Sequence, residues 1–373
     1  MRRTYGYDSY RGRFGWRNVL TILIVFLLVV LAAAVAAFFL LQKYVVYTDD
    51  GQARLELPFL QQKESLPPAS AGVGEPPVVV VTAQPSPAPE EEFLRAAVLP
   101  RSALYDGTAE EQVAAAGGNA AWFDMKADDG TLGYVSDLPA AIRFGSSAAD
   151  PALNAAIKAL NDGGLYTVAR VSCFRDNLAP RQDNSLAVRT NSGYNWRDAG
   201  DIRWLSPTVE GAQDYVAGVC RELAALGFDE ILLDNAAYPT AGQLEYIKRG
   251  GNYDESRFSQ VLDAFYAKVR EALKDYPEVK LSLSAGGAAL TGAGDKSGQT
   301  ARLLGKYADR LYLPGPESEE VSRQYDRALE GMGLSPARMV FTSPPYVPQP
   351  ASSYAPMGGT LFSPAQETMR RDP

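Results

Sequence analysis

Acidic residues that follow short apolar segments mark the places in this 373-residue chain where catalytic carboxylates could be positioned. Asp234 ends the run EILLD, Asp124 ends NAAWFD, Asp176 follows YTVARVSCF, and Glu317 follows RLYL. In a barrel of parallel strands, active sites are built at the rim formed by the carboxyl ends of the strands. Two carboxyl groups about 5–9.5 Å apart can hydrolyse a glycosidic bond, one as nucleophile or base and one as proton donor. We take Asp234 as the nucleophile or base, with Asp124 and Glu317 as further catalytic candidates.

Each of these acids also has a structural interpretation. An acid at the end of a strand often accepts hydrogen bonds from the loop that follows it. The sequence ADDG, which contains Asp128 and Asp129, is typical of a turn, so we interpret both residues as structural. For Asp124 the catalytic and the structural interpretation both remain open.

Basic and aromatic residues lie near these acids in the sequence. Arg170 and Arg175, in and after the third apolar segment, either balance the charges of the catalytic candidates or form ordinary ion pairs. Trp196 lies in the polar stretch NSGYNWRD, where its ring would be available to stack on a sugar. Tyr238 follows Asp234 closely and is a second aromatic candidate for binding substrate.

The composition excludes several kinds of site. The chain has no histidine, which excludes a Ser-His-Asp triad, a Cys-His pair and the usual histidine-containing zinc sites, and we expect no metal or cofactor. Cys173 and Cys220 are expected to be buried among apolar residues, and a disulfide between them is left open. The net charge of −8 argues against binding to nucleic acid.

Residues 19–41 form an apolar run of 23 residues without a charged side chain. A helix rises about 1.5 Å per residue, so this run can span the roughly 30 Å hydrocarbon core and predicts one transmembrane helix. Five arginines against one aspartate in residues 1–18 predict a cytoplasmic N-terminus, and hence a single-pass cell-membrane protein with an extracytoplasmic C-terminal domain. A cleaved signal peptide ending near Ala-Val-Ala at 34–36 is disfavoured, because the apolar run continues beyond it.

Three further regions follow the apolar run. Residues 42–57 contain two short β-type runs around Asp-Asp-Gly, which predicts a juxtamembrane hairpin. Residues 58–92 are rich in proline and predict an extended linker. Residues 93–373 have a length that suits one α/β barrel domain, typically about 250 residues.

The domain at 93–373 alternates short apolar strands with one-sided helices, which predicts a parallel sheet of the α/β class. We therefore predict a (β/α)8 TIM-type barrel, with strands at 94–99, 119–124, 166–174, 230–234, 280–284, 310–313 and 339–342. Only 359–362 could form an eighth strand, in a tail rich in Pro, Gly and Ser. We expect the barrel to be incomplete or irregular at this C-terminal end.

Three stretches of the domain resemble, in order, the family called putative glycosyl hydrolase domain, whose barrels are similar to alpha-amylase-like and alpha-galactosidase-like hydrolases. They are WFDMKADDGTLGY at 122–134, VARVSCFRDNLAP at 168–180, and the stretch 186–239 that ends in LGFDEILLDNAAYP. The resemblance implies a barrel that cleaves O-glycosidic bonds, with Asp234 as the acid of its fourth strand. It also implies that Lys126, Arg170, Arg175 and Asp176 belong to a site that binds carbohydrate.

The second half of the domain departs from the family. The arginine that usually follows the fourth-strand acid is absent from DNAAYP, and the fifth-strand segment SLSAGGAAL lacks an acid. Two functional hypotheses follow from this. The first is a membrane-anchored glycoside hydrolase that acts on a polysaccharide or cell-envelope glycan through its rim carboxylates. The second is a catalytically inactive barrel that binds glycan or scaffolds an envelope partner.

Overall fold

The structure, a computed structural model, describes residues 45–47, 53–55, 93–292, 295–343 and 359–362. The chain divides into two compact units, 1–84 and 85–373. The predicted cytoplasmic tail, the transmembrane segment at 19–41 and the linker at 58–92 lie outside the described residues. Among the helices that the structure describes, none is long and apolar enough to cross a membrane.

The first unit contains the hairpin that the sequence predicts within residues 42–57. Strand β1 (Val45–Tyr47) pairs antiparallel with β2 (Ala53–Leu55). Val46 lies opposite Arg54 in this register. Both strands lie within the residues for which the sequence predicts a hairpin, and the Asp-Asp-Gly segment between them lies outside the described residues.

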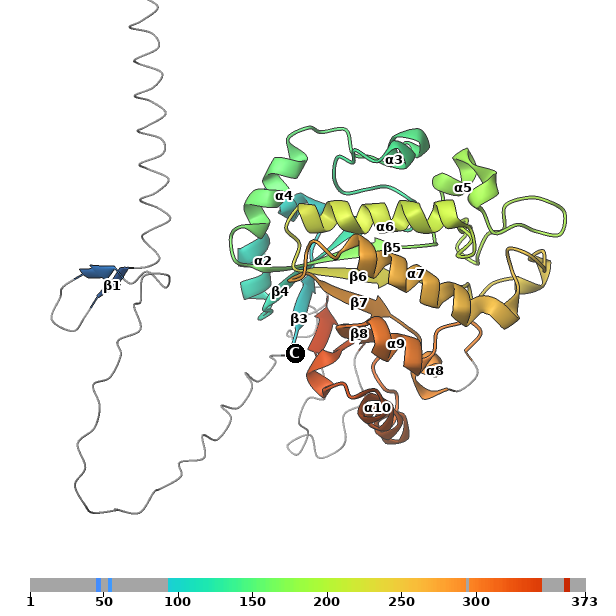
Figure 1. Ribbon diagram of the computed structural model, residues 1–373. Coiled ribbons are helices and arrows are strands. Elements are labelled where there is room, and N and C mark those ends of the chain that lie inside the picture. The colour runs from blue at the N-terminus through green and yellow to red at the C-terminus, as the bar shows by residue number, and fades with distance from the viewer. Residues whose placement is uncertain (1–44, 48–52, 56–92, 293–294, 344–358, 363–373) are drawn as a thin grey trace, which may run out of the picture. The chain divides into compact units, whose positions relative to one another are not determined.

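The second unit contains a closed barrel of eight parallel strands, as the TIM-type prediction requires (Figure 1). In chain order, which is also their order around the barrel, the strands are β3 (Arg95–Val98), β4 (Ala120–Lys126), β5 (Tyr166–Ser172), β6 (Glu230–Asp234), β7 (Lys280–Ser284), β8 (Arg310–Leu313), β9 (Met339–Phe341) and β10 (Gly359–Phe362). Each apolar segment predicted from the sequence became a strand, and the fourth, fifth and sixth have the predicted bounds.

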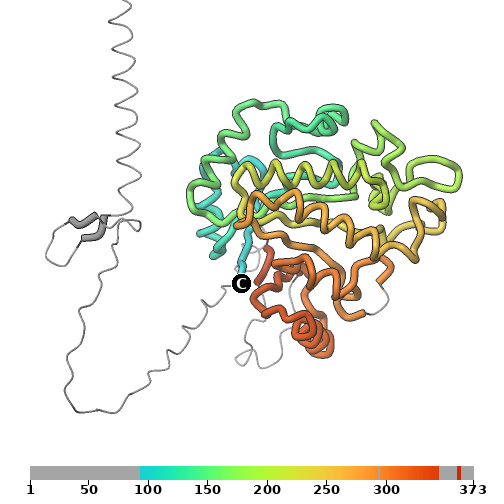
Figure 2. Tube along the Cα trace, in the orientation of Figure 1, coloured from blue at the N-terminus to red at the C-terminus, as the bar shows by residue number. Residues whose placement is uncertain are grey.

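The prediction of an incomplete C-terminal end was wrong, because β10 closes the barrel. It pairs in parallel with β9 on one side and with β3 on the other, where Thr360 lies opposite Arg95. Figure 2 follows the backbone of this unit from cyan at its start to red at its C-terminal end. A Cβ on Gly359 would lie only 2.1 Å from the backbone oxygen of Leu94, so only glycine fits this position. This four-residue strand closes the sheet through its backbone pairing. Among the described residues, no helix lies between β9 and β10.

Helices cover the outside of the barrel, with α6 and α7 side by side and α8, α9 and α10 grouped together (Figure 1). The α-helices are α2 (Ala109–Ala115), α3 (Pro139–Phe144), α4 (Leu153–Asn161), α5 (Ala179–Gln182), α6 (Glu210–Ala225), α7 (Phe258–Ala272), α8 (Gly287–Thr291), α9 (Ala301–Tyr307) and α10 (Glu319–Met332). Short 3-10 turns are η1 (Arg101–Leu104), η2 (Asn184–Leu186), η3 (Leu244–Tyr246), η4 (Glu255–Arg257) and η5 (Pro336–Arg338).

Side-chain alternation along each strand divides the core into two parts and positions the polar residues of the rim. On β6, Ile231 and Leu233 join the large core cluster that the helices share, whereas Leu232 joins the cluster inside the barrel. Successive strand residues point to opposite faces, so Asp234 shares the inner side with Leu232. The same period places Asp124 on β4 and Arg170 on β5 on the inner side at the same end of the barrel.

A second group of polar side chains lies at the opposite, N-terminal end of the barrel. The fully buried carboxylate of Glu230 accepts hydrogen bonds from Tyr166 (2.8 Å), Ser282 (2.7 Å) and Tyr312 (2.9 Å), and pairs with Arg310. Because this face of a TIM barrel contributes stability and the opposite face contributes chemistry, we interpret the group as structural.

The two cysteines are free thiols inside the core. Burial raises the pKa of both, that of Cys220 to about 12, so Cys173 and Cys220 stay protonated at neutral pH. A thiolate is the reactive form of cysteine, and neither residue therefore suits nucleophilic catalysis.

Candidate active site

Arg170 on β5 holds three carboxylates at the rim of the barrel. Its Nη1 donates to Oδ1 of Asp124 at 2.9 Å, and its Nη2 donates to Oδ1 of Asp128 at 2.6 Å. Its Nε and Nη2 both donate to Oδ2 of Asp234, at 2.8 Å and 2.6 Å. Burial lowers the pKa of Arg170, but the three carboxylates outweigh it and the net pKa is raised. Arg170 therefore remains a cation around which the acids are arranged.

Arg175 extends this group to a fourth carboxylate. It pairs with Asp128 and donates from Nε to Oδ2 of Asp198 at 2.6 Å, where Trp204 Nε1 also donates at 3.0 Å. Burial raises the pKa of Asp128 and of Asp198, but their hydrogen bonds and ion pairs lower it more, so both lie below the usual value. The resulting cluster, called here the rim network, contains Asp124, Asp128, Asp198, Asp234, Arg170 and Arg175.

The rim network unites residues that the sequence placed on three different strands. The predicted candidates Asp124 and Asp234 meet on one guanidinium, and Arg170 and Arg175 are the residues that carry the opposite charge. Asp128 lies in the predicted turn, but it also joins the network, which the turn interpretation missed. The signal available in the sequence was that Asp128 lies four residues after Asp124, across a turn at the end of a strand.

Asn235, directly after Asp234, has an unusual backbone conformation. Its φ is +47°, in the left-handed region that few residues other than glycine adopt. Its side chain donates to Oδ1 of Asp128 at 3.2 Å and to Oγ of Ser172 at 3.0 Å. Backbone strain of this kind often occurs at functional sites, where surrounding contacts maintain it.

We expect Asn235→Ala to be less stable than Asn235→Gly by about 1 kcal/mol. The left-handed backbone conformation brings the Cβ of alanine too close to the backbone, and glycine has no Cβ. Both variants lose the same side-chain hydrogen bonds, so their difference isolates the backbone. Urea unfolding of the two variants measures it, and equal midpoints would show that the positive φ carries no strain.

A cavity of about 360 Å³ opens beside Asp234, at the ends of β6 and β7. Three carboxyl groups line it, those of Asp198, Asp234 and Asp295. Tyr238 also lines it, stacked on Phe258 with ring centroids 3.4 Å apart. Burial raises the pKa of the Tyr238 phenol to about 12, so this group is neutral at physiological pH. The cavity thus places acids at the rim where barrel enzymes place their chemistry. Tyr238 is only 2% exposed and its ring is stacked on Phe258, which corrects the expectation that it binds substrate.

Asp295 was not predicted from the sequence as a functional residue. It lies in the glycine-rich stretch GAGDKSG after the short helix α8, and so does not directly follow an apolar strand. It therefore does not share the pattern, an acid at the end of an apolar segment, that identified Asp124 and Asp234. Its position between glycines, in a segment too polar for a strand, was the only local signal.

Several predicted site residues lie away from the cavity. Lys126 and Asp176 have no exposed side-chain area and pair with each other at 2.7 Å, so they cannot touch a substrate in this structure. Trp196 is only 2% exposed and donates from Nε1 to the backbone oxygen of Gln243 at 3.0 Å. These placements correct the expectation that Lys126, Asp176 and Trp196 bind substrate.

The predicted proton donor Glu317 is also not brought to Asp234. Its side chain is exposed after β8, and neither Glu317 nor Asp124 is among the residues that line the cavity. The chain leaves β8 through Pro314, Gly315 and Pro316, and Gly315 is tied to Ser343 by a 2.9 Å hydrogen bond. The geometry gives no support to Glu317 as the facing acid.

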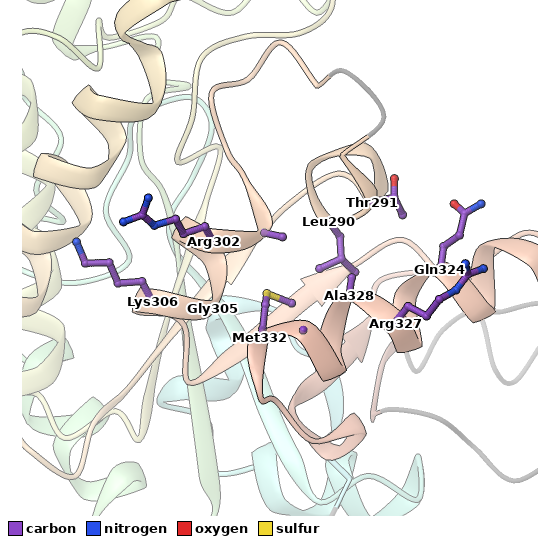
Figure 3. Close-up of a pocket in the computed structure, with 11 residues that line it drawn as sticks. Leu290, Thr291, Arg302, Gly305, Lys306, Gln324, Arg327, Ala328 and Met332 are labelled. Atoms are coloured by element: carbon purple, nitrogen blue, oxygen red, sulfur yellow. The ribbon is translucent and has the colours of Figure 1, made fainter.

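A larger hollow of about 650 Å³ lies between α8, α9 and α10 (Figure 3). Leu290, Ala328 and Met332 occupy its middle, with Arg302 and Lys306 on one side and Gln324 and Arg327 on the other. No carboxyl group is among its lining residues in the described chain. It therefore lacks the groups for glycoside hydrolysis, and the smaller rim cavity is the better candidate.

The profile of the family described as "Putative glycosyl hydrolase domain" matches residues 110–312, more than half of the chain. The chain belongs to this family. The matched segment of this glycosyl hydrolase domain contains Asp124, Arg170, Asp234 and Asp295, and it ends before Glu317. Membership implies a carbohydrate as the ligand of the domain.

Solved structures resemble the chain as well. A hypothetical protein from Ruminiclostridium thermocellum ATCC 27405 is 27% identical, with a TM-score of 0.43, over 50% of this chain and 96% of that one. The PgaB (BpsB) glycoside hydrolase domain from Bordetella bronchiseptica is 15% identical, with a TM-score of 0.51, over 73% and 94%. Aspergillus fumigatus Ega3, in complex with galactosamine, is 10% identical, with a TM-score of 0.42, over 74% and 94%. No curated protein matches the chain. The PgaB similarity supports the barrel fold of the glycosyl hydrolase domain and nothing finer.

Proposed function

We propose that this glycosyl hydrolase domain cleaves a polysaccharide or cell-envelope glycan, with Asp234 as the nucleophile or as the base that activates water. The observation that carries this proposal is the position of Asp234, which lines a rim cavity while Arg170 fixes its carboxylate from the other side. We propose in addition that residues 19–41 anchor the protein in the membrane and that the domain is extracytoplasmic, on the basis of the apolar run and the arginine-rich residues 1–18.

The hydrogen bonds of Asp234 leave it one acceptor position for chemistry. A carboxylate has about four lone-pair positions. Arg170 uses both on Oδ2, and the backbone N–H of Asn235 donates to Oδ1 at 2.9 Å. The remaining position on Oδ1 is available to an anomeric carbon or to a water molecule. The three fixed bonds hold the carboxylate in one orientation, which a reaction at a single atom requires.

Asp124 is a poor choice for the second catalytic carboxyl group. It accepts from Nη1 of the same guanidinium whose Nε and Nη2 hold Asp234, so Arg170 stands between the two acids. A glycosidic bond cannot occupy the same space. Asp124 therefore serves as a charge partner that helps to orient Arg170.

The charges around the cavity favour a neutral or cationic glycan over an anionic one. Asp198, Asp234 and Asp295 line it together with one cation, Arg175, which is already paired with Asp128 and Asp198. The rim network beside the cavity has four carboxylates against two guanidinium groups, and this surplus of negative charge repels anionic substrates. Uronic acid polymers would therefore bind poorly.

The test is to incubate the full-length protein with neutral, amino-sugar and uronic-acid polysaccharides and to measure new reducing ends. We expect release from a neutral or amino-sugar polymer and none from the uronic-acid polymers. Release from none of them would overturn the hydrolase proposal. Binding without release would favour the alternative of an inactive glycan-binding barrel, which is consistent with three of the four acceptor positions of Asp234 being occupied.

A further inference from the structure

The three carboxyl groups that line the rim cavity differ in their partners. Asp198 is held by Arg175 and Trp204, and its Oδ1 accepts from the backbone N–H of Gly200 at 2.9 Å and of Ile202 at 3.1 Å. These bonds occupy Asp198 fully. Asp234 is held by Arg170, so each of these two acids has a guanidinium partner.

Asp295 has no cationic partner within the part of the chain that the structure describes. Oδ1 of the half-buried Asp295 accepts the backbone N–H of Ser297. The neighbouring Lys296 is exposed and forms no ion pair with it among the described residues. Asp295 is thus the one cavity-lining acid whose carboxyl group is not neutralised by an arginine.

The second oxygen of Asp295 lies near Gly286, and both residues line the cavity. A Cβ on Gly286 would be 3.7 Å from Oδ2 of Asp295, and Gly286 lines the same cavity. Because Gly286 has no side chain, nothing from this residue covers the oxygen. Oδ2 accepts no hydrogen bond within the described chain, which leaves it free to meet a ligand.

A short loop holds Asp295 against the ends of β6 and β7. Ser297 accepts the backbone N–H of Tyr238 at 3.0 Å, and Ser297 Oγ accepts that of Gln299 at 3.0 Å. The side chain of Gln299 donates to the backbone oxygen of Ser284, the last residue of β7, at 3.0 Å. The acid is therefore positioned by the same strand ends that position Asp234.

We propose that Asp295 is the proton donor that acts opposite Asp234, an inference that rests on the proposed hydrolase function. A two-carboxyl mechanism needs one acid that carries a proton and one that is ionised. Asp234 and Asp198 each pair with an arginine, whereas Asp295 has no arginine partner among the described residues. Asp295 replaces Glu317 in this role because it lines the cavity and Glu317 does not.

The step balances as follows. The carboxyl group of Asp295 gives its proton to the glycosidic oxygen, which takes the electron pair of the breaking bond to the anomeric carbon and leaves as an alcohol. Oδ1 of Asp234, or a water molecule that loses its proton to Oδ1, gives the electron pair of the new bond. When Asp234 itself forms the bond, water hydrolyses the intermediate and Asp295 takes the proton of that water.

The competing interpretation of Asp295 is structural. Its bond to the N–H two residues ahead has the form of an Asx turn, which aspartate commonly makes in loops. Asp254, which is half-buried like Asp295, makes the same kind of turn with Ser256 at 3.1 Å but does not line the cavity. Asp254→Asn is therefore the matched control for Asp295→Asn.

The experiment measures kcat/KM of the full-length protein on the polysaccharide that it cleaves and on a dinitrophenyl glycoside of the same sugar. The sugar hydroxyl that leaves from the polysaccharide must be protonated as the bond breaks. Dinitrophenolate is a stable anion and leaves almost as well without a proton. We expect Asp295→Asn to lower kcat/KM by about 10²–10⁴-fold on the polysaccharide and by only a few-fold on the dinitrophenyl glycoside. Asp254→Asn should change neither substrate.

Other outcomes overturn the proposal in distinguishable ways. An equal loss on both substrates would assign Asp295 to the structural turn. Normal turnover of Asp295→Asn, with turnover abolished in Asp234→Asn, would remove the donor role and leave the hydrolase function standing. Inactivity of the unmodified protein on every polysaccharide would remove both.

Discussion

Replacing Asp234 with asparagine is expected to lower glycan cleavage by at least about a thousandfold, the scale of losing a nucleophile or base. Asparagine keeps the shape of the side chain but removes its charge. In one orientation the NH2 group of the new amide faces the guanidinium of Arg170, and in the other it faces the backbone N–H of Asn235. Both partners are donors, so a hydrogen bond is lost in either orientation. We therefore expect a stability loss of about 1–3 kcal/mol as well, with the fold retained. Reducing-end release and urea unfolding measure the two effects separately.

Asp124→Asn is the matched control for this variant. Asp124 also accepts from Arg170 but does not line the cavity, so its loss should cost stability with a far smaller effect on rate. Turnover of Asp234→Asn at the normal rate would remove Asp234 from the mechanism. Similar rate losses in both variants would mean that the rim network as a whole, and not the Asp234 carboxylate, sets the activity.

Replacing Lys126 with methionine is expected to destabilise the domain by about 3–5 kcal/mol, the cost of leaving a buried charge without its partner. Lys126 and Asp176 have no exposed side-chain area, and Lys126 Nζ also donates to the backbone oxygen of Ser172 at 2.8 Å. Methionine fills much of the same volume, so the loss of charge dominates. The free energy of unfolding in urea is the measurement.

The double variant Lys126→Met with Asp176→Asn provides the control. Asparagine keeps an acceptor for the N–H groups of Leu178 and Ala179, which Asp176 Oδ1 now accepts at 2.9 Å each. The double variant should therefore recover a large part of the stability that the single variant loses. No recovery would mean that the buried carboxylate is not the source of the cost. A selective change in KM with unchanged stability would instead restore the sequence prediction that Lys126 binds substrate.

The strands were predictable because their signals are local. The segments at 230–234, 280–284 and 310–313 are short apolar runs, and the structure gives them the same bounds. The closing strand was harder to predict because barrel closure depends on the register between Thr360 and Arg95, which are far apart in the sequence. Parallel pairing at such a distance leaves no local pattern beyond the short run itself.

The site was only partly predictable for a similar reason. Asp124 and Asp234 were predictable because each ends an apolar segment, and the carboxyl ends of neighbouring parallel strands lie at one rim, with Arg170 on the strand between them. Asp295 reaches the cavity through a loop, and loop paths depend on tertiary contacts such as the bond from Gln299 to Ser284.

Trp196 shows the opposite error. Its neighbours in the sequence are polar, but its indole is covered by the segment around Gly242, where a Cβ would lie 3.2 Å from the ring. Burial of this kind comes from a distant part of the chain.

The closing role of β10 has a consequence for synthesis of the protein. Translation proceeds from the N-terminus, so β3 leaves the ribosome long before its neighbour at Gly359–Phe362 exists. Until then one backbone edge of β3, and later one edge of β9, has hydrogen-bonding groups without a partner. Open strand edges are sites of aggregation, so a nascent chain of this protein needs protection until β10 has been made. A premature stop codon shortly before Gly359 would make that exposure permanent, although all six residues of the rim network would be present.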